Sequence, residues 1–199
     1  MGGLKVRQAT VSDVEPAVRT LARAFEDYPM TRMGLDPDDY PARLAQYQRL
    51  FLTEIGLAQG RVWVTDDVSA VAVWTTPSTP ADVFAPHADA FQALAGSRAA
   101  LAAEYEQAMG TFRPREPIWF LGLLGVEPDR QHQGLGRAVV APGLAAADQD
   151  HSPAFLETQE PANLPFYESL GFVTVAELQL PHDGPIHYAL YRPARSAGR

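Results

Sequence analysis

The stretch of sequence that decides the fold reads Val126-Glu127-Pro128-Asp129-Arg130-Gln131-His132-Gln133-Gly134-Leu135-Gly136-Arg137. Residues 118–126 are apolar almost throughout, which indicates a strand buried on both faces, and residues 134–147 have the pattern of a helix. Two glycines between them let backbone N–H groups approach an anion closely, and the helix N-terminus adds positive potential. The stretch therefore predicts a phosphate-binding turn, and the alternative is a helix cap that binds nothing.

The spacing of this turn excludes two common nucleotide-binding motifs. A dinucleotide-binding fingerprint needs a third glycine where this chain has Val139. A P-loop needs Gly-Lys-Ser/Thr, whereas the single lysine of the chain is Lys5, near the N-terminus. If the turn binds an anion, it must therefore do so mainly through backbone N–H groups.

The composition of the 199 residues narrows the function further. The formal net charge is −8, which disfavours nucleic-acid binding. The chain has no cysteine, so disulfides, thiolate zinc sites and cysteine nucleophiles are excluded, and its histidines show no metal-ligand spacing. We find no targeting signal and no apolar run of about 18 residues, so we expect a cytoplasmic protein with no membrane contact and no metal.

The remaining sequence indicates strands alternating with helices. Strands are expected at 4–9, 61–64, 70–74, 118–126, 154–157, 172–180 and 186–191. Helices are expected at 12–28, with Ser12 and Glu15 at capping-box spacing, at 41–55, at 134–147 and at 164–170, and residues 81–109 are expected to form two helices with a break near 96–98. This order predicts one α/β (α+β) domain spanning residues 1–199, built around a mixed sheet.

A second motif follows the turn and carries a family resemblance. It is the segment Asn163-Leu164-Pro165-Phe166-Tyr167-Glu168-Ser169-Leu170-Gly171-Phe172. Together with Gln131-x-x-Gly134-x-Gly136, it resembles the GNAT superfamily of acetyltransferases. The resemblance implies a central, mostly antiparallel mixed sheet flanked by helices, and acetyl transfer from acetyl-CoA to an amine without an acyl-enzyme. The lack of cysteine and of a Gly-x-Ser-x-Gly elbow agrees with direct transfer.

The resemblance also implies where acetyl-CoA binds. The strand before the turn offers its backbone to the pantetheine arm, and the N–H of Val126 polarises the thioester carbonyl. Backbone N–H groups of residues 133–138 hold the pyrophosphate, and the Asn163 side chain contacts the pantetheine. The implied cofactor-binding residues are Leu124, Gly125, Val126, Gln131, His132, Gln133, Gly134, Leu135, Gly136, Arg137, Ala138 and Asn163.

Tyr167 matches the general acid of the family, and a core aromatic side chain is the alternative. A tyrosine with a pKa near 10 stays protonated at neutral pH and can donate a proton to a departing thiolate. Glu157, at the end of its strand, is our candidate for the base that deprotonates the amine. Glu116, Asp27 and a chain of water molecules are the alternatives.

Stretches outside the two motifs resemble the puromycin N-acetyltransferase subfamily, among them residues 71–77 and 153–158. The resemblance implies an aromatic amine as acceptor, with resistance to puromycin as the consequence. Phe25, Tyr28, Trp74 and Trp119 are the candidate acceptor-binding residues, and ordinary core packing is the alternative for each. The competing functions are acetylation of another amine metabolite or of a protein N-terminus, and a CoA-binding module without catalysis.

Overall fold

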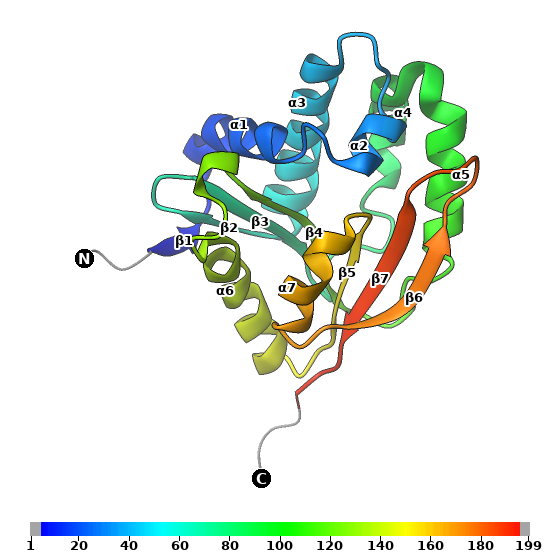
Figure 1. Ribbon diagram of the computed structural model, residues 1–199. Helices are drawn as coiled ribbons and strands as arrows, with labels where there is room; N and C mark the ends of the chain where they lie inside the picture. Colours follow the sequence, from blue (N-terminus) through cyan, green and yellow to red (C-terminus); the bar gives the residue numbers. More distant parts are fainter. Residues whose placement is uncertain (1–4, 196–199) are drawn as a thin grey trace.

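Seven strands form a single twisted sheet in the order β1-β2-β3-β4-β5-β7-β6 in the computed structural model, which describes residues 5–195 (Figure 1). Among the strand pairs of the described residues, β4 and β5 are parallel, and every other neighbouring pair is antiparallel. The strands are β1 (Val6–Gln8), β2 (Arg61–Thr65), β3 (Ala70–Thr75), β4 (Trp119–Val126), β5 (Ala154–Thr158), β6 (Val173–Gln179) and β7 (Ile186–Arg192). The expected mixed, mostly antiparallel sheet is confirmed.

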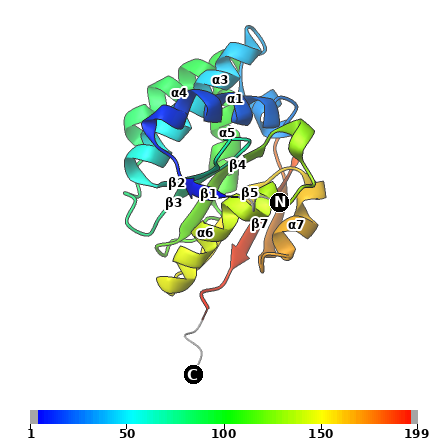
Figure 2. The ribbon, with the colours of Figure 1, turned by 90° about the vertical axis from the view of Figure 1, so that its left-hand side faces the viewer.

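Helices cover both faces of this sheet. The view in Figure 2 shows α1 and α3 on one side of β1–β4 and α6 on the other. The helices are α1 (Val14–Ala24), α2 (Pro29–Gly34), α3 (Tyr40–Leu50), α4 (Ala88–Ala95), α5 (Ala99–Gly110), α6 (Leu135–Gln149) and α7 (Leu164–Glu168). No helix in residues 5–195 is long and apolar enough to cross a membrane.

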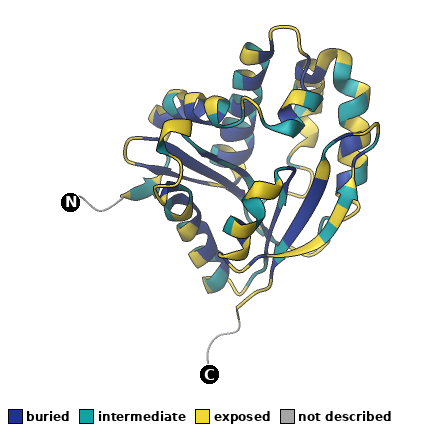
Figure 3. Ribbon diagram, viewed as in Figure 1, coloured by how far each residue is buried: buried dark blue, intermediate teal, exposed yellow. Residues whose placement is uncertain are grey.

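Each face of the sheet has its own core, because alternate strand residues point to opposite sides. Figure 3 shows the central strands as the most continuously buried part of the molecule. On the α6 side, Trp74, Leu121 and Val140 belong to one cluster. On the α1 side, Leu21, Val73 and Leu123 belong to another.

The feature that creates a site is the divergence of β4 and β5. The two strands pair only where Trp119, Phe120 and Leu121 face Ala154, Phe155 and Leu156. Beyond Leu121, β4 continues to Val126 paired with β3 alone among the described strands. A register shift between β3 and β4 follows the last residue that β4 pairs with β5. The sheet therefore opens like a V between its two halves.

Helices α4 and α5 form an excursion between β3 and β4, and they are fastened to the loop before α3. The Asp36 carboxylate accepts hydrogen bonds from the backbone N–H groups of Ser97 (2.6 Å) and Asp38 (2.9 Å). Arg43 donates to the carbonyl oxygen of Ala93 at 2.7 Å. These contacts hold the end of α4 and the break before α5 against α3 and the loop that precedes it. Figure 1 labels the three helices.

The structure departs from the sequence-based elements in three places. A short helix, α2, stands after Tyr28, where the pattern predicted the end of a helix and a loop. The first helix begins at Val14, and Asp13, rather than Glu15, caps the preceding turn by accepting a hydrogen bond from the Thr10 N–H at 2.7 Å. Residues Phe51–Leu57 continue α3 as a π-helical segment. Of the predicted strand 4–9, Leu4 lies outside the described residues.

Candidate active site

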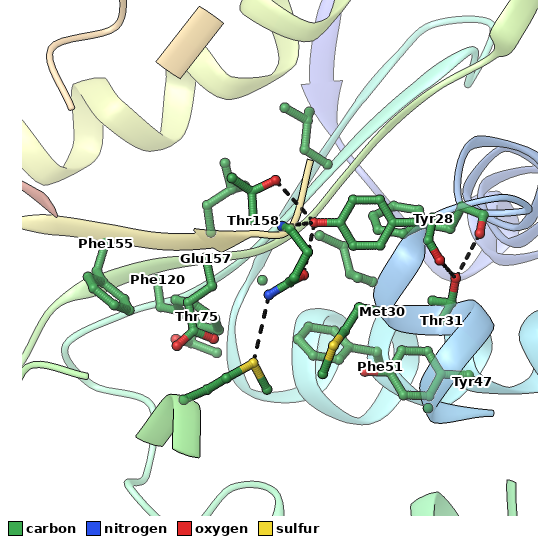
Figure 4. A pocket seen from close by; sticks show the side chains of 18 of the residues that line it. Tyr28, Met30, Thr31, Tyr47, Phe51, Thr75, Phe120, Phe155, Glu157 and Thr158 are labelled. Atoms are coloured by element: carbon green, nitrogen blue, oxygen red, sulfur yellow. Dashed lines mark hydrogen bonds between the residues drawn. The ribbon is translucent and has the colours of Figure 1, made fainter. Parts of the chain in front are cut away.

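The divergence of β4 and β5 opens into a cleft of about 2050 Å³. One half lies over the start of α6 and α7. The other half, which we call the acceptor pocket, lies between β4–β5 and the helices α2, α3, α4 and α5, and it includes Phe25, Tyr28, Tyr47, Phe51, Glu106, Arg113 and Glu157. Figure 4 shows several of these side chains converging from strands and helices.

The glycine-rich turn leads directly into the N-terminus of α6. Gly134 has φ +81°, a left-handed conformation that glycine adopts without strain, and it precedes the first residue of α6, Leu135. The first N–H groups of a helix have no partner within the helix, so those of Leu135, Gly136 and Arg137 are available to an anion. The N–H of Ala138 donates to the Gly134 carbonyl at 3.0 Å. Ala138 is therefore removed from the predicted phosphate contacts.

The side chains around this turn divide into those on the cleft and those that turn away. Most predicted residues line the cleft, namely Gln131, His132, Gly134, Leu135, Gly136 and Arg137. Gln133 lies outside the lining, and its side chain contacts Arg130 at 3.2 Å. His132 takes φ +61°, a left-handed conformation that is uncommon for residues other than glycine.

Positive charge at the turn comes from Arg137 more than from Arg130. The Arg137 guanidinium donates to the neutral hydroxyl of Ser169 at 2.6 Å and lines the cleft. Arg130 is paired with Asp67 at 3.0 Å, so most of its charge is balanced. Because the whole chain is acidic, this local cation matters for binding a polyanion.

The edge of β4 presents backbone groups to the opening of the V. Glu127 donates its N–H to Ser69, on the β3 side, at 2.9 Å. Successive N–H groups along a strand point to opposite sides, so those of Val126 and Leu124 point away from β3, toward the cleft. Leu124 and Val126 line the cleft, whereas Gly125 lies against Leu21 and Ala24 of α1 and offers the cleft no surface.

Asn163 precedes α7, Tyr167 lies in its second half, and both line the cleft. The Tyr167 side chain is largely buried, with 8% exposure, yet it lines the cleft. Its ring is held edge-on by Phe166 and Phe172, and its hydroxyl has no hydrogen bond among the described residues. Burial, with a smaller contribution from Tyr28, raises the Tyr167 pKa well above 10.

Glu157 projects into the acceptor pocket from β5 (Figure 4). Burial raises the pKa of its carboxyl group, while Arg113 lowers it through hydrogen bonds at 2.9 Å to both carboxylate oxygens. The two alternative bases, Glu116 and Asp27, also line the cleft. Glu116 accepts a hydrogen bond from the Tyr191 hydroxyl at 2.9 Å, and Asp27 pairs with Arg32 at 2.8 Å on the exposed surface.

Phe25 and Tyr28, two of the candidate acceptor-binding residues, line the acceptor pocket. Their rings meet edge-to-face, with centroids 5.1 Å apart. The Tyr28 hydroxyl accepts a hydrogen bond from the Gln159 N–H at 2.9 Å and lies 3.1 Å from the Thr158 hydroxyl, which ties the helical wall to β5 (Figure 4). Burial raises the pKa of Tyr28, so its hydroxyl stays protonated at neutral pH.

The assignment of Trp74 and Trp119 to the acceptor pocket is wrong. Neither side chain lines the cleft, and they are 0% and 4% exposed. The Trp74 indole lies against Gly143 of α6 and packs edge-on against Trp119 with centroids 6.1 Å apart. Strand alternation places both rings on the α6 side of the sheet, in its core, whereas the acceptor pocket lies on the opposite side.

Several pocket residues were missed from the sequence. Their single-residue signals are those of ordinary core aromatics and of a loop, so only their spatial convergence reveals them. They are Tyr47, Phe51, Phe84, Phe91, Phe155, Glu106, Arg113 and Gln159. Within residues 5–195, no group of three or more His, Asp or Glu side chains is arranged to hold a metal ion.

Two comparisons with known proteins match part of the chain. Residues 95–174 match the model of the acetyltransferase (GNAT) domain. A curated relative described as an uncharacterised N-acetyltransferase of Schizosaccharomyces pombe is 34% identical over 65 residues, which is 33% of this chain. The chain spans about a quarter of that relative, 26% of its length.

Solved structures show the same fold over nearly the whole chain. A Corynebacterium glutamicum protein described as a histone acetyltransferase and related acetyltransferase has a TM-score of 0.74 at 23% identity, covering 98% of this chain and 99% of its own. Arylalkylamine N-acetyltransferase 2 of Aedes aegypti has a TM-score of 0.62 at 13% identity, covering 98% and 100%. A ribosomal-protein alanine N-acetyltransferase of Escherichia coli has a TM-score of 0.59 at 17% identity, covering 98% and 96%.

The chain has the GNAT fold, with the divergent β4 and β5 and the glycine-rich turn described above. The family model covers residues 95–174, and the solved structures extend the likeness in fold to nearly the whole chain.

Proposed function

We propose that this chain is an acetyl-CoA-dependent N-acetyltransferase whose acceptor is the primary amine of a small molecule. The observation that carries the proposal is the alignment of three features along one cleft. They are the anion-binding N–H groups at Leu135–Arg137, the unpaired β4 edge at Leu124 and Val126, and the free hydroxyl of Tyr167. We further propose that residues 1–199 act as one domain in the cytoplasm.

The residues of the cleft fit acetyl-CoA by their chemistry. Leu135, Gly136 and Arg137 offer backbone donors for a pyrophosphate, and the Arg137 guanidinium adds positive charge. The backbone of Leu124 and Val126 offers peptide-like partners for an extended amide arm, as an added strand would. Acetyl-CoA supplies an acetyl group activated as a thioester, so the protein needs no nucleophile of its own.

The protein's contribution to the transfer is orientation and proton management. Holding the amine next to the acyl carbon replaces an encounter in solution with a single bound geometry. As the new C–N bond forms and the C–S bond breaks, the Val126 N–H stabilises the charge on the carbonyl oxygen, and Tyr167 donates its proton to the sulfur. We propose that Glu157, directly or through water, accepts the proton that the ammonium group loses.

The acceptor pocket favours an amine attached to an aromatic or other apolar group. Its walls carry Phe25, Tyr28, Tyr47, Phe51 and Phe91, and Glu106 and Glu157 add carboxylates. Flat aromatic side chains suit an aromatic acceptor, and a carboxylate suits a cation. On the resemblance in sequence, puromycin is the first acceptor that we propose to test.

A different amine is the second candidate, because a structural neighbour is an arylalkylamine N-acetyltransferase. Residues of α4 and α5 form one wall of the acceptor pocket, which favours a small molecule over a protein N-terminus as the first class of acceptor to test. A CoA-binding module without catalysis is the remaining alternative.

The test measures the thiol released from acetyl-CoA with puromycin, an arylalkylamine and an N-terminal peptide as acceptors. Rapid release with puromycin supports the proposal, and release with another acceptor alone rejects the puromycin assignment. Binding of CoA without acetylation of any acceptor would favour the non-catalytic module.

Tyr167→Phe tests the proposed proton donor. We expect turnover to fall about 100-fold or more, with the CoA dissociation constant unchanged, because general acid catalysis contributes about 10²–10⁴-fold. Tyr188→Phe is the matched control, since Tyr188 is equally buried at 8% exposure but lies outside the cleft. Unchanged turnover in Tyr167→Phe would reject the assigned role.

A further inference from the structure

Arg113, in the loop that follows α5, holds two carboxylates from different parts of the fold. Its Nε and Nη2 atoms donate to Oε1 and Oε2 of Glu157, each at 2.9 Å. The same guanidinium donates to Glu106 of α5, with Nη2 at 3.2 Å from Oε2. One cation therefore joins the excursion between β3 and β4 to the carboxylate on β5.

The burial of Glu157 gives this pairing its importance. The Glu157 side chain is 10% exposed, whereas that of Arg113 is 33% exposed. A carboxylate removed from water stays ionised only where a cation or several donors compensate for the lost hydration. Two parallel N–H···O bonds also fix the direction of the carboxylate, which a single contact would leave free to rotate.

The other groups that face Glu157 do not replace Arg113. His187 on β7 is fully buried, and its Nε2 lies 3.8 Å from Glu157 Oε1, beyond hydrogen-bonding distance. The Gln159 amide donates to His187 Nδ1 at 2.8 Å, so the neutral ring carries its hydrogen on Nε2. Burial lowers the pKa of His187 to about 4, which keeps it uncharged.

The remaining neighbours of this carboxylate are uncharged or acidic. Tyr28 and Tyr47 face it from the helical wall, and burial raises the pKa of each hydroxyl, that of Tyr47 to about 12. Glu106 adds a second negative charge. Among the described residues, Arg113 is thus the cation that faces Glu157.

We propose that Arg113 is a positioning residue that holds Glu157 as an oriented anion facing the acceptor amine. The excursion of α4 and α5 is then part of the acceptor site, because its last helix and the loop after it supply the cation. The role of this pair in catalysis rests on the proposed function. The pairing of Arg113 with Glu157 can be tested without any substrate.

The test without substrate follows the carboxyl signals of the glutamates by NMR as the pH is changed. Glu157→Gln identifies the signal of Glu157 by its loss. In Arg113→Met we expect the Glu157 titration to move to higher pH by about 1–3 units, the range for losing an opposite charge at this distance. Arg113→Lys keeps the charge and loses the two-point contact, so we expect a smaller shift.

The test with substrate measures kcat/KM for the acceptor across pH. We expect the acidic limb of the profile to move upward in Arg113→Met by the same amount as the NMR titration, and to return most of the way in Arg113→Lys. Arg49→Met is the control, because Arg49 makes a comparable two-point pair with Glu15 (2.6 and 2.7 Å) away from the cleft. We expect its profile to match the wild type.

The outcomes separate the two proposals. A Glu157 titration that stays in place in both folded variants would overturn the positioning role, whatever the activity. A titration that moves in a protein that acetylates no amine would leave the pairing intact and reject the proposed function. If Arg113→Met does not fold, the Glu157 titration is compared between Arg113→Lys, which keeps the positive charge, and Arg113→Gln, which removes it. A loss of thermal stability without movement of the acidic limb would mean that Arg113 is only structural.

Discussion

Gln48 lies in α3 with a fully buried side chain, 0% exposed. Neither its amide nitrogen nor its amide oxygen has a hydrogen-bond partner among the described residues. A buried polar group without a partner destabilises the folded state by about 1–3 kcal/mol. Methionine has nearly the same length and volume as glutamine and carries no group that requires such a partner.

We expect Gln48→Met to raise the free energy of unfolding by about 1–3 kcal/mol. For a chain of this length, each kcal/mol raises the melting temperature by roughly 2–4 °C. Denaturant titration and thermal unfolding followed by circular dichroism measure both quantities. Gln46→Met is the matched control on the same helix, because Gln46 is exposed, and we expect it to change stability by less than about 0.5 kcal/mol.

A loss of stability in Gln48→Met would refute this reasoning. It would mean that the amide of Gln48 is satisfied in solution, for example by a buried water molecule, and that methionine removes those bonds. Gln48→Ala separates packing from polarity. We expect it to be less stable than Gln48→Met, because it leaves a cavity in the same place.

Two further predictions concern the turn and the buried histidine. Gly134→Ala introduces a side chain at φ +81°, which costs about 1–2 kcal/mol, so we expect CoA to bind about tenfold more weakly by calorimetry. Gly110→Ala is its control, because Gly110 also has open space around it but has no positive φ and lies outside the cleft lining. Equal CoA affinities of Gly134→Ala and the wild type would contradict the proposed anion-binding role of the turn. His187 has a pKa lowered to about 4 in the folded state, against about 6.5 when unfolded, so its contribution to stability is complete above pH 6.5 and disappears as the pH falls toward 4. We expect His187→Gln to flatten the fall in melting temperature over that window, and an unchanged slope would show that His187 does not cause it.

Strong local patterns made much of the fold predictable. The sequence alone shows the apolar run of β4, the hairpin of β2 and β3, and the two helices of residues 81–109. Each is recognisable from the hydrophobic pattern, or from a break in that pattern, within one continuous segment. The short helix α2 and the π-helical turn after α3 lack such signals, because packing against neighbouring segments stabilises them. The start of the first helix differed for a local reason, because Asp13 bonds to Thr10, three residues earlier, and Ser12 and Glu15 do not form the expected cap.

The candidate site also has one part that the local sequence predicts and one part that depends on tertiary packing. The glycine-rich turn and the segment around Tyr167 are contiguous, so their residues are recognisable in order. The acceptor pocket draws Tyr28, Tyr47, Arg113 and Glu157 from distant elements, and each looks in sequence like an ordinary core aromatic or surface charge. Trp74 and Trp119 looked equally suited to the pocket, and only the face of the sheet on which they lie excluded them.

The sequence by itself determined the class of the domain, its strand and helix order, and the turn at Gln131–Arg137, because these depend on residues close together in the chain. Only the tertiary structure decided which side chains share a cavity and which charge faces which. A charge pair such as Arg113 and Glu157 depends on how an excursion of the chain folds back over the sheet. That return is set by packing and by contacts such as Asp36 with Ser97, and no local pattern encodes it.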